Sequence, residues 1–313
     1  MKYDLICIGT ALVDSIIRGF HPEPVSASGF TAESCSLNAG GEAVNASVAA
    51  SKLGLKAAIL CALGRDAAGS LVRSVLEQYG VDTGLIADSP QTPVTTMFVN
   101  RDGSRKSITN EAHRHNFHPE AASLPETKAI LLGSLFRAPF DDPGIVHSVL
   151  ASAKRSGQIT FADTKLPNFR IITPDNLKDS FPLMDYITPN EDEARFFTGK
   201  EDPEEMADVF LNYGVKNVII KMGGRGCLLK SSEGSTCLLP AYTIEAVDAT
   251  GAGDNFAAGF VSEILRGKTK EEALQFANAC GAICTTAVGA AAALKSRRQV
   301  LDWINTEKAI HYD

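Results

Sequence analysis

One stretch of the chain, residues 248–259, combines a turn of small residues with an acidic side chain just after it. Gly251, Ala252 and Gly253 precede Asp254, and from Ala252 onward apolar residues recur at the four-residue spacing of a helix. A glycine turn at a helix start leaves backbone N–H groups pointing outward, and these groups together with the helix dipole form a site for an anion. The sequence therefore predicts an anion hole made by the amides of Gly251, Ala252 and Gly253.

An acidic residue, Asp254, directly follows this predicted anion hole and needs an explanation. A carboxylate beside an anion site is repelled by the bound anion unless the reaction needs it. Transfer of a phosphoryl group to an alcohol does need one, because a carboxylate must take the proton of the alcohol while amides hold the developing negative charge. We interpret Asp254 as that general base. The alternative is that Asp254 only caps the helix, since Asp is favoured in a first turn.

Composition narrows the class of protein further. The chain has 313 residues, of which 44% are hydrophobic, and this suits one large α/β unit with its own core. A formal charge of −7 argues against nucleic acid or an anionic membrane as the main partner. We see no signal peptide pattern and no apolar run long enough to span a membrane. With seven cysteines, an odd number set mostly in apolar runs, we expect free thiols and a cytoplasmic protein.

The elements that must position these residues follow the alternation of strand and helix that is typical of a parallel sheet. Strands are predicted at residues 4–9, 56–63, 129–132, 158–162, 185–188, 217–221 and 242–247, with a hairpin at 227–239. Helices are predicted at residues 46–53, 67–79, 143–156, 191–197, 203–213, 269–286 and 296–304, besides the one that starts at Ala252. We see no repeat or linker in this order, so we expect a single domain over residues 1–313.

Residues 95–109 break the alternation. Two β-rich runs flank Asp102-Gly103, which is a hairpin signal, and their pattern does not suit a helix that crosses between parallel strands. Together with residues 12–18 they are expected to form a small sheet over the site, as a lid built from about residues 11–37 and 94–112. The alternative is an edge hairpin without a role in function.

The longer pattern resembles the ribokinase-like (PfkB) carbohydrate kinases. Residues 248–259, Asp-x-Thr-Gly-Ala-Gly-Asp-x-Phe-x-x-Gly, are similar to the second signature of that family, and Gly40-Gly41-x-x-x-Asn45 is similar to the first. Asp14 and residues 190–193 and 221–226 also match, so the resemblance covers the whole chain. It implies a doubly wound α/β fold, with a mostly parallel sheet flanked by helices and a small β-sheet lid. The implied activity is ATP-dependent transfer of the γ-phosphoryl group to a hydroxyl of a sugar or sugar-like substrate.

The resemblance implies that Asp14, Gly40, Gly41 and Asn45 bind the sugar. A glycine pair allows a small ligand to approach the backbone, Asp accepts hydrogen bonds from hydroxyls, and Asn both donates and accepts. Taken alone, Asp14 is equally consistent with a turn carboxylate and Asn45 with a helix cap. Glu42 stands at a position that varies with substrate in the family, so we expect it to touch the substrate.

Asn190 and Glu193 match the family's Asn-x-x-Glu motif. They stand one helical turn apart, so both can face one ligand. The resemblance implies that they hold Mg²⁺ through its waters, in keeping with the reluctance of this ion to lose its hydration shell. The alternative is a plain capping box, in which Asn190 and Glu193 satisfy each other's backbone amides.

The glycine-rich stretch after the predicted strand 217–221 is implied to flank the nucleotide. The nucleotide-binding residues that the resemblance implies are Lys221, Gly223, Gly224, Gly226, Thr250 and, beside the adenine, Asn278. The competing interpretation of residues 223–226 is a hairpin turn before Cys227, and Asn278 is equally consistent with an exposed position on its helix.

Many members of the family also bind a monovalent cation such as K⁺ beside the anion hole. The matching positions are the side chain of Asp248 and the carbonyls of Thr250, Cys284, Ala287 and Gly289, while Ala293 replaces a serine ligand of the family. A second departure is at residues 163–167, where Lys165 and Pro167 stand in a motif that reads Asp-x-Asn-x-Arg in many sugar-specific members. Lys165 can still supply positive charge to phosphate.

Two other functions compete with a sugar kinase. A nucleoside kinase of the same fold would need an aromatic clamp for a base, for which Phe98 and Phe117 are the candidates. A protein that senses a sugar or a nucleotide without catalysis would have no need of Asp254, Gly253 and Glu193. We expect a small-molecule sugar and ATP as partners, with no nucleic acid and no membrane. The resemblance leaves open a homodimer through the lid, as some relatives form.

Overall fold

The central sheet is the element on which the predicted site residues depend. The computed structural model describes residues 2–19, 31–100, 104–110, 117–119, 124–167 and 170–310. The sheet has the strand order β14 (Thr236–Leu239), β13 (Cys227–Ser231), β12 (Asn217–Lys221), β11 (Tyr186–Ile187), β10 (Ile159–Thr164), β9 (Thr127–Leu135), β1 (Tyr3–Ile8) and β4 (Ala57–Leu60). Neighbouring strands from β4 to β12 are parallel, whereas β13 and β14 continue the sheet as an antiparallel hairpin. The predicted, mostly parallel sheet is confirmed.

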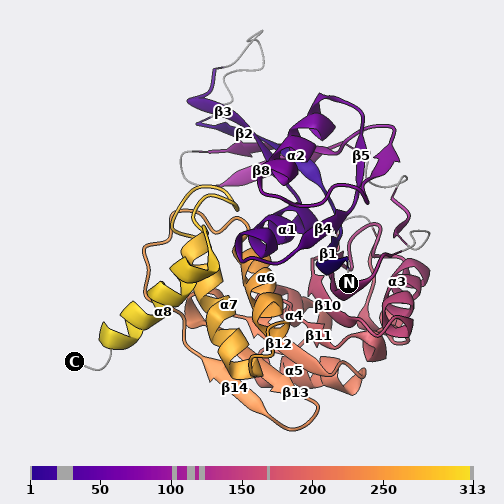
Figure 1. Ribbon diagram of the computed structural model, residues 1–313, viewed down its shortest axis with the longest axis vertical. Coiled ribbons are helices and arrows are strands. Elements are labelled where there is room, and N and C mark those ends of the chain that lie inside the picture. The colour runs from indigo at the N-terminus through magenta and orange to yellow at the C-terminus, as the bar shows by residue number, and fades with distance from the viewer. Residues whose placement is uncertain are drawn as a thin grey trace.

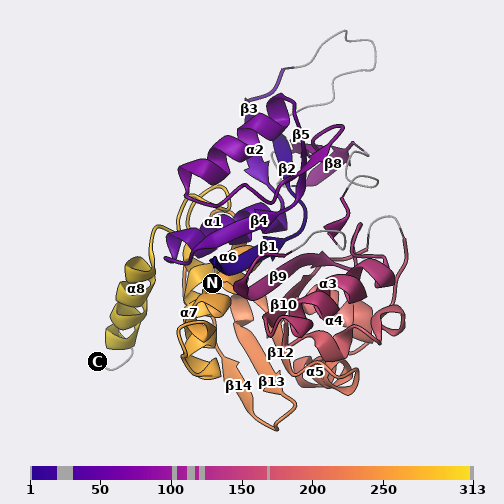
Figure 2. The same cartoon turned by 45° about the vertical axis from the view of Figure 1, so that its right-hand side comes forward.

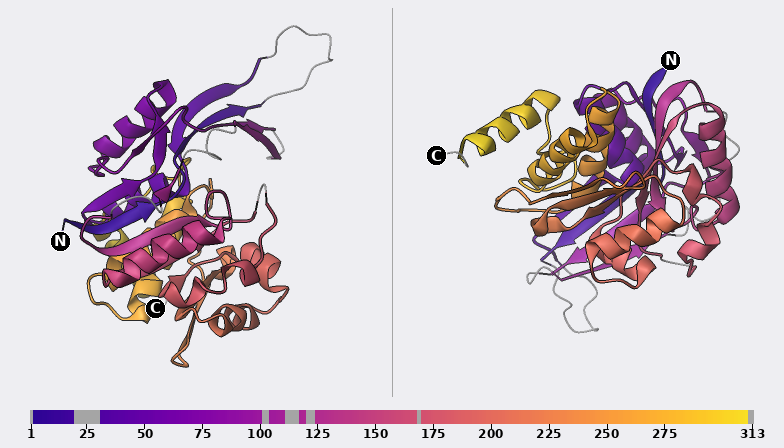
Figure 3. Two further views of the ribbon diagram at one scale, coloured as in Figure 1. Left: turned by 90° about the vertical axis from the view of Figure 1, so that its right-hand side faces the viewer. Right: turned by 90° about the horizontal axis from the view of Figure 1, so that it is seen from below.

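Helices cover both faces of this sheet, as Figure 3 shows most directly. Strand β1 illustrates the reason, because Leu5 and Cys7 lie in one hydrophobic core while Ile6 and Ile8 lie in the other. The first core also contains residues of α1 (Glu42–Lys52), α2 (Ala67–Gln78), α6 (Ala252–Ile264), α7 (Lys270–Cys284) and α8 (Arg297–Ile310). The second contains residues of α3 (Pro143–Arg155), α4 (Glu191–Thr198) and α5 (Pro203–Asn212). The doubly wound arrangement that the sequence predicted is therefore confirmed.

Several helices begin where a short polar side chain satisfies the first free amides. Asp66 accepts from the amide of Gly69, Asp142 from those of Gly144 and Ile145, and Thr269 from that of Glu272. Such caps explain why the predicted starts of α2 and α3 agree with the structure. No helix in the described part of the chain is both long enough and apolar enough to cross a membrane.

A second, smaller sheet lies above the central one in Figure 1. Its order is β3 (Ser34–Gly40), β2 (Leu12–Arg18), β7 (Val94–Val99) and β8 (Arg105–Thr109). The predicted hairpin is formed, since β7 and β8 are antiparallel, and β7 runs parallel to β2. Residues 20–30, 101–103 and 111–112 of the predicted lid lie outside the described residues. In Figure 2 the small sheet and α2 stand together above the central sheet.

Two predicted strands differ from the structure, and one strand of the structure was not predicted. Residues 56–63 form two strands, β4 and β5 (Ala62–Gly64), and β5 leaves the central sheet to pair with β6 (Ala87–Ser89). Strand β3 was missed, because its Ser- and Gly-rich surroundings indicated a loop. The strand predicted at residues 242–247 is wrong, and the amides of Val247 and Asp248 donate to the carbonyl of Thr285 at the end of α7 instead of to a neighbouring strand.

Candidate active site

The predicted site residues converge at the carboxyl ends of the parallel strands, together with the first turns of α1, α4 and α6. Polar residues follow each strand in turn: Thr10 after β1, Ser134 in β9, Asp163 and Lys165 at the end of β10, Asn190 after β11, and Lys221 at the end of β12. Ligands of open α/β sheets bind outside this edge, because the strands and the helix N-termini that follow them present their polar groups there. The topology therefore brings together residues that are far apart in the sequence, such as Asn45 and Asp254, which are 209 positions apart.

Asp254 lies in the first turn of α6 and contacts α1 directly. The Asn45 side-chain amide donates to Asp254 Oδ2 at 2.7 Å. Burial, followed by the negative charge of Glu42, raises the pKa of Asp254 to about 7, although the charge of Lys165 opposes the rise. Asn45 is inside α1 and its cap is Gly41, so the helix-cap alternative for Asn45 is wrong. A carboxyl group whose pKa is near neutrality can exchange a proton under ordinary conditions.

The turn before Asp254 is partly open. Gly251 has φ 76°, which a glycine adopts without strain, and an added Cβ would lie 2.2 Å from the Cβ of Ala290. The amide of Ala252 donates to the carbonyl of Ala249 at 3.2 Å, which corrects the prediction that all three amides face an anion. Within the described ranges, nothing accepts a hydrogen bond from the amides of Gly251 and Gly253.

Lys221 supplies the positive charge that the sequence did not place at this turn. A Cβ added to Gly253 would lie 3.1 Å from Lys221 Nζ, so the ammonium group sits beside the turn. Lys221 Nζ also donates to Asp163 Oδ1 at 2.6 Å, and both side chains are nearly buried. Two amides and an ammonium group thus lie at the turn that precedes Asp254, and such a set of donors can stabilise a phosphate-like anion.

Asn190 and Glu193 lie next to this pair and form the capping box. Asn190 Oδ1 accepts from the amide of Glu193 at 2.9 Å, and Glu193 Oε2 accepts from the amide of Asn190 at 3.0 Å and from Thr164 Oγ1 at 2.7 Å. The alternative interpretation is therefore realised in the structure. Glu193 is 4% exposed, and burial raises its pKa while the charge of Lys221 opposes the rise and that of Asp163 adds to it.

Asp14 belongs to the small sheet and faces the same space. It lies on β2, opposite Asn38 of β3 and Thr95 of β7. A Cβ added to Gly40 would lie 2.3 Å from Asp14 Oδ2, and one added to Gly41, which has φ 100°, would lie 2.4 Å from the carbonyl of Thr10. The glycine pair is thus required by the protein's own packing. Burial, with the charge of Glu42 as the second cause, raises the pKa of Asp14 to about 6.

Glu42 is held by three groups from three strand ends. Thr10 Oγ1 and Ser134 Oγ each donate to Glu42 Oε2 at 2.6 Å, and Lys165 Nζ lies 3.3 Å from Glu42 Oε1. Although burial opposes ionisation, the charge of Lys165 and the two hydroxyls keep the pKa of Glu42 well below its ordinary value. Lys165 is therefore paired with a Glu42 carboxylate that the two hydroxyls hold in place.

A comparison with known families assigns the chain to one of them. The model of the family described as "pfkB family carbohydrate kinase" matches residues 2–297, which is nearly the whole chain. The chain belongs to the pfkB family of carbohydrate kinases. It is therefore an enzyme of the kinase class, and the resemblance found in the sequence is confirmed.

Individual relatives of this pfkB-family chain cover it almost end to end. The ribokinase of Haemophilus influenzae is 28% identical over 312 residues, which span 97% of this chain and 99% of that protein. The structure of Arabidopsis thaliana ribokinase complexed with ribose and ATP is 26% identical, with a TM-score of 0.84, over 97% of this chain and 99% of that one. A candidate ribokinase II from E. coli, in complex with ATP and Mg²⁺, is 25% identical with a TM-score of 0.78 over the same shares. The ribokinase-like fold is confirmed.

Other residues that the pfkB resemblance implied have local structural tasks. Gly226 has φ 98°, and an added Cβ would lie 1.9 Å from the carbonyl of Leu239, so this glycine is needed by the β13–β14 hairpin. Cβ atoms added to Gly223 and Gly224 would meet open space, which leaves both positions accessible. Asn278 Nδ2 donates to the carbonyl of Pro240 at 2.8 Å and thereby ties α7 to the segment after β14.

The residues matched to a monovalent cation site in this pfkB chain lie around Asp248. Asp248 Oδ1 accepts from the amide and hydroxyl of Thr250, and Asp248 Oδ2 accepts from the amide of Gly289. These bonds hold the pKa of Asp248 below its ordinary value although burial opposes them. Cys284 Sγ lies 3.5 Å from the carbonyl of Thr250, and Ala287 and Ala293 belong to the loop that follows α7.

The same loop is also held from α1. Lys52 Nζ donates to the carbonyls of Ala291 and Leu294, the latter at 3.0 Å. Asn255 Nδ2 donates to the carbonyls of Gly251 and Ala290 at 2.8 and 2.9 Å. The loop after α7 is thus fastened against the glycine turn by one lysine and one asparagine, and sequence reasoning found neither.

Sequence reasoning also missed Thr10, Ser134 and the role of Asp163. A signal was available for Asp163 and Thr10, because both follow apolar strands at the carboxyl edge of a predicted parallel sheet. Ser134 gave no such signal, since its position depends on a positive φ of 60°. Phe117, a candidate clamp for a nucleoside base, is 7% exposed and packs edge-on against Phe140 in the core.

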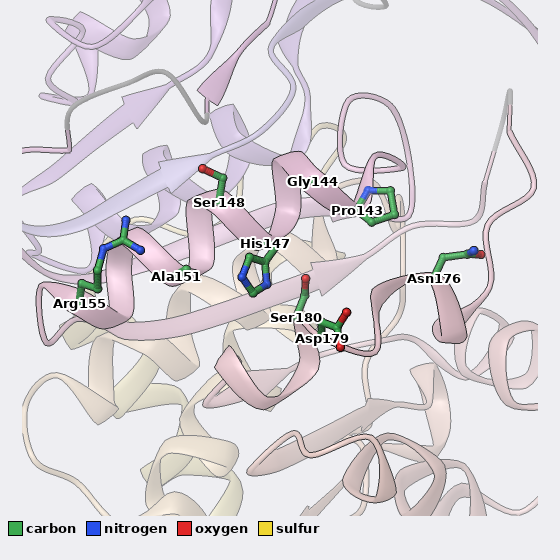
Figure 4. Close-up of a pocket in the computed structure, with 9 residues that line it drawn as sticks. All are labelled: Pro143, Gly144, His147, Ser148, Ala151, Arg155, Asn176, Asp179 and Ser180. Atoms are coloured by element: carbon green, nitrogen blue, oxygen red, sulfur yellow. The ribbon is translucent and has the colours of Figure 1, made fainter.

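A surface pocket elsewhere in the molecule contains none of the predicted residues. It lies between α3 and the short turns at Pro174–Leu177 and Phe181–Leu183, with a volume of about 510 Å³ (Figure 4). His147, Arg155 and Asp179 are among the residues that line it. Neither Asp254 nor its partner Asn45 lines this pocket, so the candidate site described above is the one at the strand ends.

Proposed function

We propose that this protein transfers the γ-phosphoryl group of ATP to a hydroxyl of a sugar or sugar-like substrate, with Asp254 as the general base. The observation that carries the proposal is the position of Asp254. It starts α6 directly after a turn with two amides that no described group accepts from, and the ammonium group of Lys221 lies beside that turn. One acid and one anion site therefore share the same space, as phosphoryl transfer to an alcohol requires.

The acceptor sugar would lie between the two sheets. Asp14 approaches from β2, whereas Asn45 and Asp254 approach from α1 and α6. The Asn45 amide orients the carboxyl group of Asp254, and the remaining oxygen of that group receives the proton of the attacking hydroxyl. Because Asp14 stands on the small sheet, we further propose that residues 11–37 and 94–112 act as a lid within a single domain, so that closure completes the acceptor site.

The phosphates of ATP would lie against the amides of Gly251 and Gly253 and the ammonium group of Lys221. Asn190 and Glu193 are the residues that would hold Mg²⁺ through its waters, and Asp163 places a second carboxyl group beside Glu193, as suits a cation. When bound, the ion would neutralise charge on the transferred phosphoryl group. Asp248, Thr250, Cys284, Ala287 and Gly289 are the corresponding group for K⁺.

The test is Asp254→Asn in an assay that measures ADP release over a panel of pentoses, hexoses, sugar acids and nucleosides. We expect kcat to fall by about 10²–10⁴-fold, because the amide cannot accept the proton, while the affinity for ATP is kept. Asp208→Asn on the exposed face of α5 serves as the matched control and should behave as the unaltered protein. Unchanged turnover in the Asp254→Asn variant would refute the assignment.

A further inference from the structure

We propose that the acceptor of this kinase is an uncharged polyol or sugar, and that Glu42 excludes acceptors carrying a carboxylate or phosphate by neutralising Lys165. This inference rests on the proposed function, because it takes Asp254 as the point that the acceptor hydroxyl reaches. It concerns the charge of the acceptor, which neither the fold nor the transferred group determines.

The first observation is that Glu42 is fixed in place. Its Oε2 accepts two hydrogen bonds of 2.6 Å, from Thr10 and Ser134, and these two hydroxyls lie 3.4 Å from each other. Its Oε1 faces Lys165 Nζ at 3.3 Å. A carboxylate that is held by three partners from β1, β9 and β10 cannot turn away to leave the lysine unpaired.

The second observation is the backbone of Ser134. This residue is fully buried and has φ 60°, in the region that side-chain-bearing residues seldom adopt. Such a conformation persists only where the surrounding structure imposes it, and such positions cluster at functional sites. Here it brings the Ser134 hydroxyl to Glu42, so the fold maintains an unfavourable backbone conformation to hold this carboxylate.

The third observation is the balance of charge around the acceptor. The charges that act on Asp254 include those of Glu42 and Lys165, and the charge of Glu42 also acts on Asp14. Three carboxyl groups therefore surround the space, while Lys165 is already paired. An anionic acceptor would be repelled by these carboxylates and would find its counter-charge occupied, whereas neutral hydroxyls can hydrogen bond to all of them.

Lys165 remains accessible, which makes the inference testable. Its side chain is 40% exposed, compared with 16% for the side chain of Glu42. Glu42→Gln keeps the size of the side chain and an oxygen for the hydroxyls of Thr10 and Ser134, but it removes the charge that compensates Lys165. The substitution should therefore leave the lysine free for an anionic acceptor.

The experiment compares a neutral sugar with its carboxylate and phosphate derivatives, by kcat/KM and by isothermal titration calorimetry without nucleotide. For the unaltered protein we expect a preference for the neutral compound of at least about tenfold. Glu42→Gln should shift the neutral-to-anionic ratio toward the anionic compound by about tenfold or more, and Lys165→Gln should shift it the other way. Asp208→Asn also removes one negative charge, but on α5 beside Lys230 and away from the acceptor space, and should leave the ratio as it is.

A preference of the unaltered protein for an anionic acceptor would overturn the inference, as would an unchanged ratio in a folded Glu42→Gln variant. If that variant does not fold, the direction of the Lys165→Gln shift decides. Because calorimetry reads the preference without catalysis, absence of phosphoryl transfer would count against the proposed function alone. Preferential transfer to anionic acceptors by the unaltered protein would uphold the kinase and refute the charge filter.

Discussion

The site contains two lysine–carboxylate pairs that differ in how tightly they are closed. Lys221 and Asp163 meet at 2.6 Å with side chains that are 13% and 9% exposed, and Asp163 also accepts from Thr188 Oγ1 at 2.7 Å. Lys165 and Glu42 stand 3.3 Å apart, and the lysine is 40% exposed. The first pair lies beside the glycine turn, and the second lies beside Asp14 and Asp254.

The difference indicates two separate tasks. A closed pair holds its ammonium group at one position, as the proposed contact of Lys221 with a phosphate group would require. A looser pair sets the net charge of the acceptor space, where three carboxyl groups surround one compensated lysine. The acceptor side therefore has two carboxyl groups without a paired lysine, Asp14 and Asp254, whereas the phosphate side has one, Glu193. Burial, followed by the charge of Glu42, raises the pKa values of Asp14 and Asp254.

The largest effect is expected from breaking the closed pair. Lys221→Met removes the ammonium group beside Gly253 and leaves Asp163 buried without its partner. We expect kcat/KM to fall by about 10²-fold or more and the free energy of unfolding to fall by about 3–5 kcal/mol. Activity assays and chemical unfolding would measure the two losses.

The double variant Lys221→Met with Asp163→Asn separates the loss of activity from the loss of stability. It removes the buried charge, so stability should largely return while activity should not. Recovery of activity in the double variant would contradict the role that we give to Lys221.

A smaller effect is expected in the pH dependence of kcat/KM. Asp254 acts as a base only when ionised, so activity should decline as the pH falls below about 7. Glu42→Gln removes a negative charge that raises the pKa of Asp254, so the acid limb should move to lower pH. Lys165→Gln removes a charge that lowers the pKa of Asp254, so the limb should move to higher pH. If both variants shifted the acid limb in the same direction, a group other than Asp254 would control it.

The smallest effect is expected in stability on the acceptor side. The folded-state pKa of Asp254, about 7, lies above the ordinary value for Asp, so its contribution is present at low pH and is lost as the pH rises through 7. Asp254→Asn should therefore melt at a higher temperature than the unaltered protein at pH 8, with the advantage shrinking toward pH 4. Asp163→Asn, which breaks a balanced pair, should melt at a lower temperature. An Asp254→Asn variant that is less stable at pH 8 would argue against the imbalance.

The sequence predicted most of the fold because apolar runs and caps are local signals. Strand β12, for example, has the predicted bounds, and Asp142 with Pro143 marks the start of α3. The strand predicted at residues 242–247 was wrong because the prediction used a local signal alone. Alternating apolar residues predict a strand, but they do not reveal that the amide of Val247 donates to the end of α7. Local pattern alone does not identify the partner of a backbone group.

The site was predicted less completely than the fold. Residues in long motifs, such as Gly251 and Asp254, could be named from the sequence, and their meeting with Asn45 follows from the topology. The Glu42–Lys165 pair joins residues more than a hundred positions apart through hydroxyls of two further strands. Such a cluster depends on the register of β1, β9 and β10 and on the positive φ of Ser134, and a short sequence motif predicts neither of these.

Helix α1 connects the proposed acceptor site with the loop that packs against the glycine turn. Its first turns carry Glu42 and Asn45, and its last residue, Lys52, donates to the loop whose Ala290 packs against Gly251. Eleven residues at about 1.5 Å each make a stiff rod of roughly 16 Å between these ends. The spacing between the proposed acceptor site and the glycine turn is therefore set by one helix, and any tilt of this helix would displace both ends together.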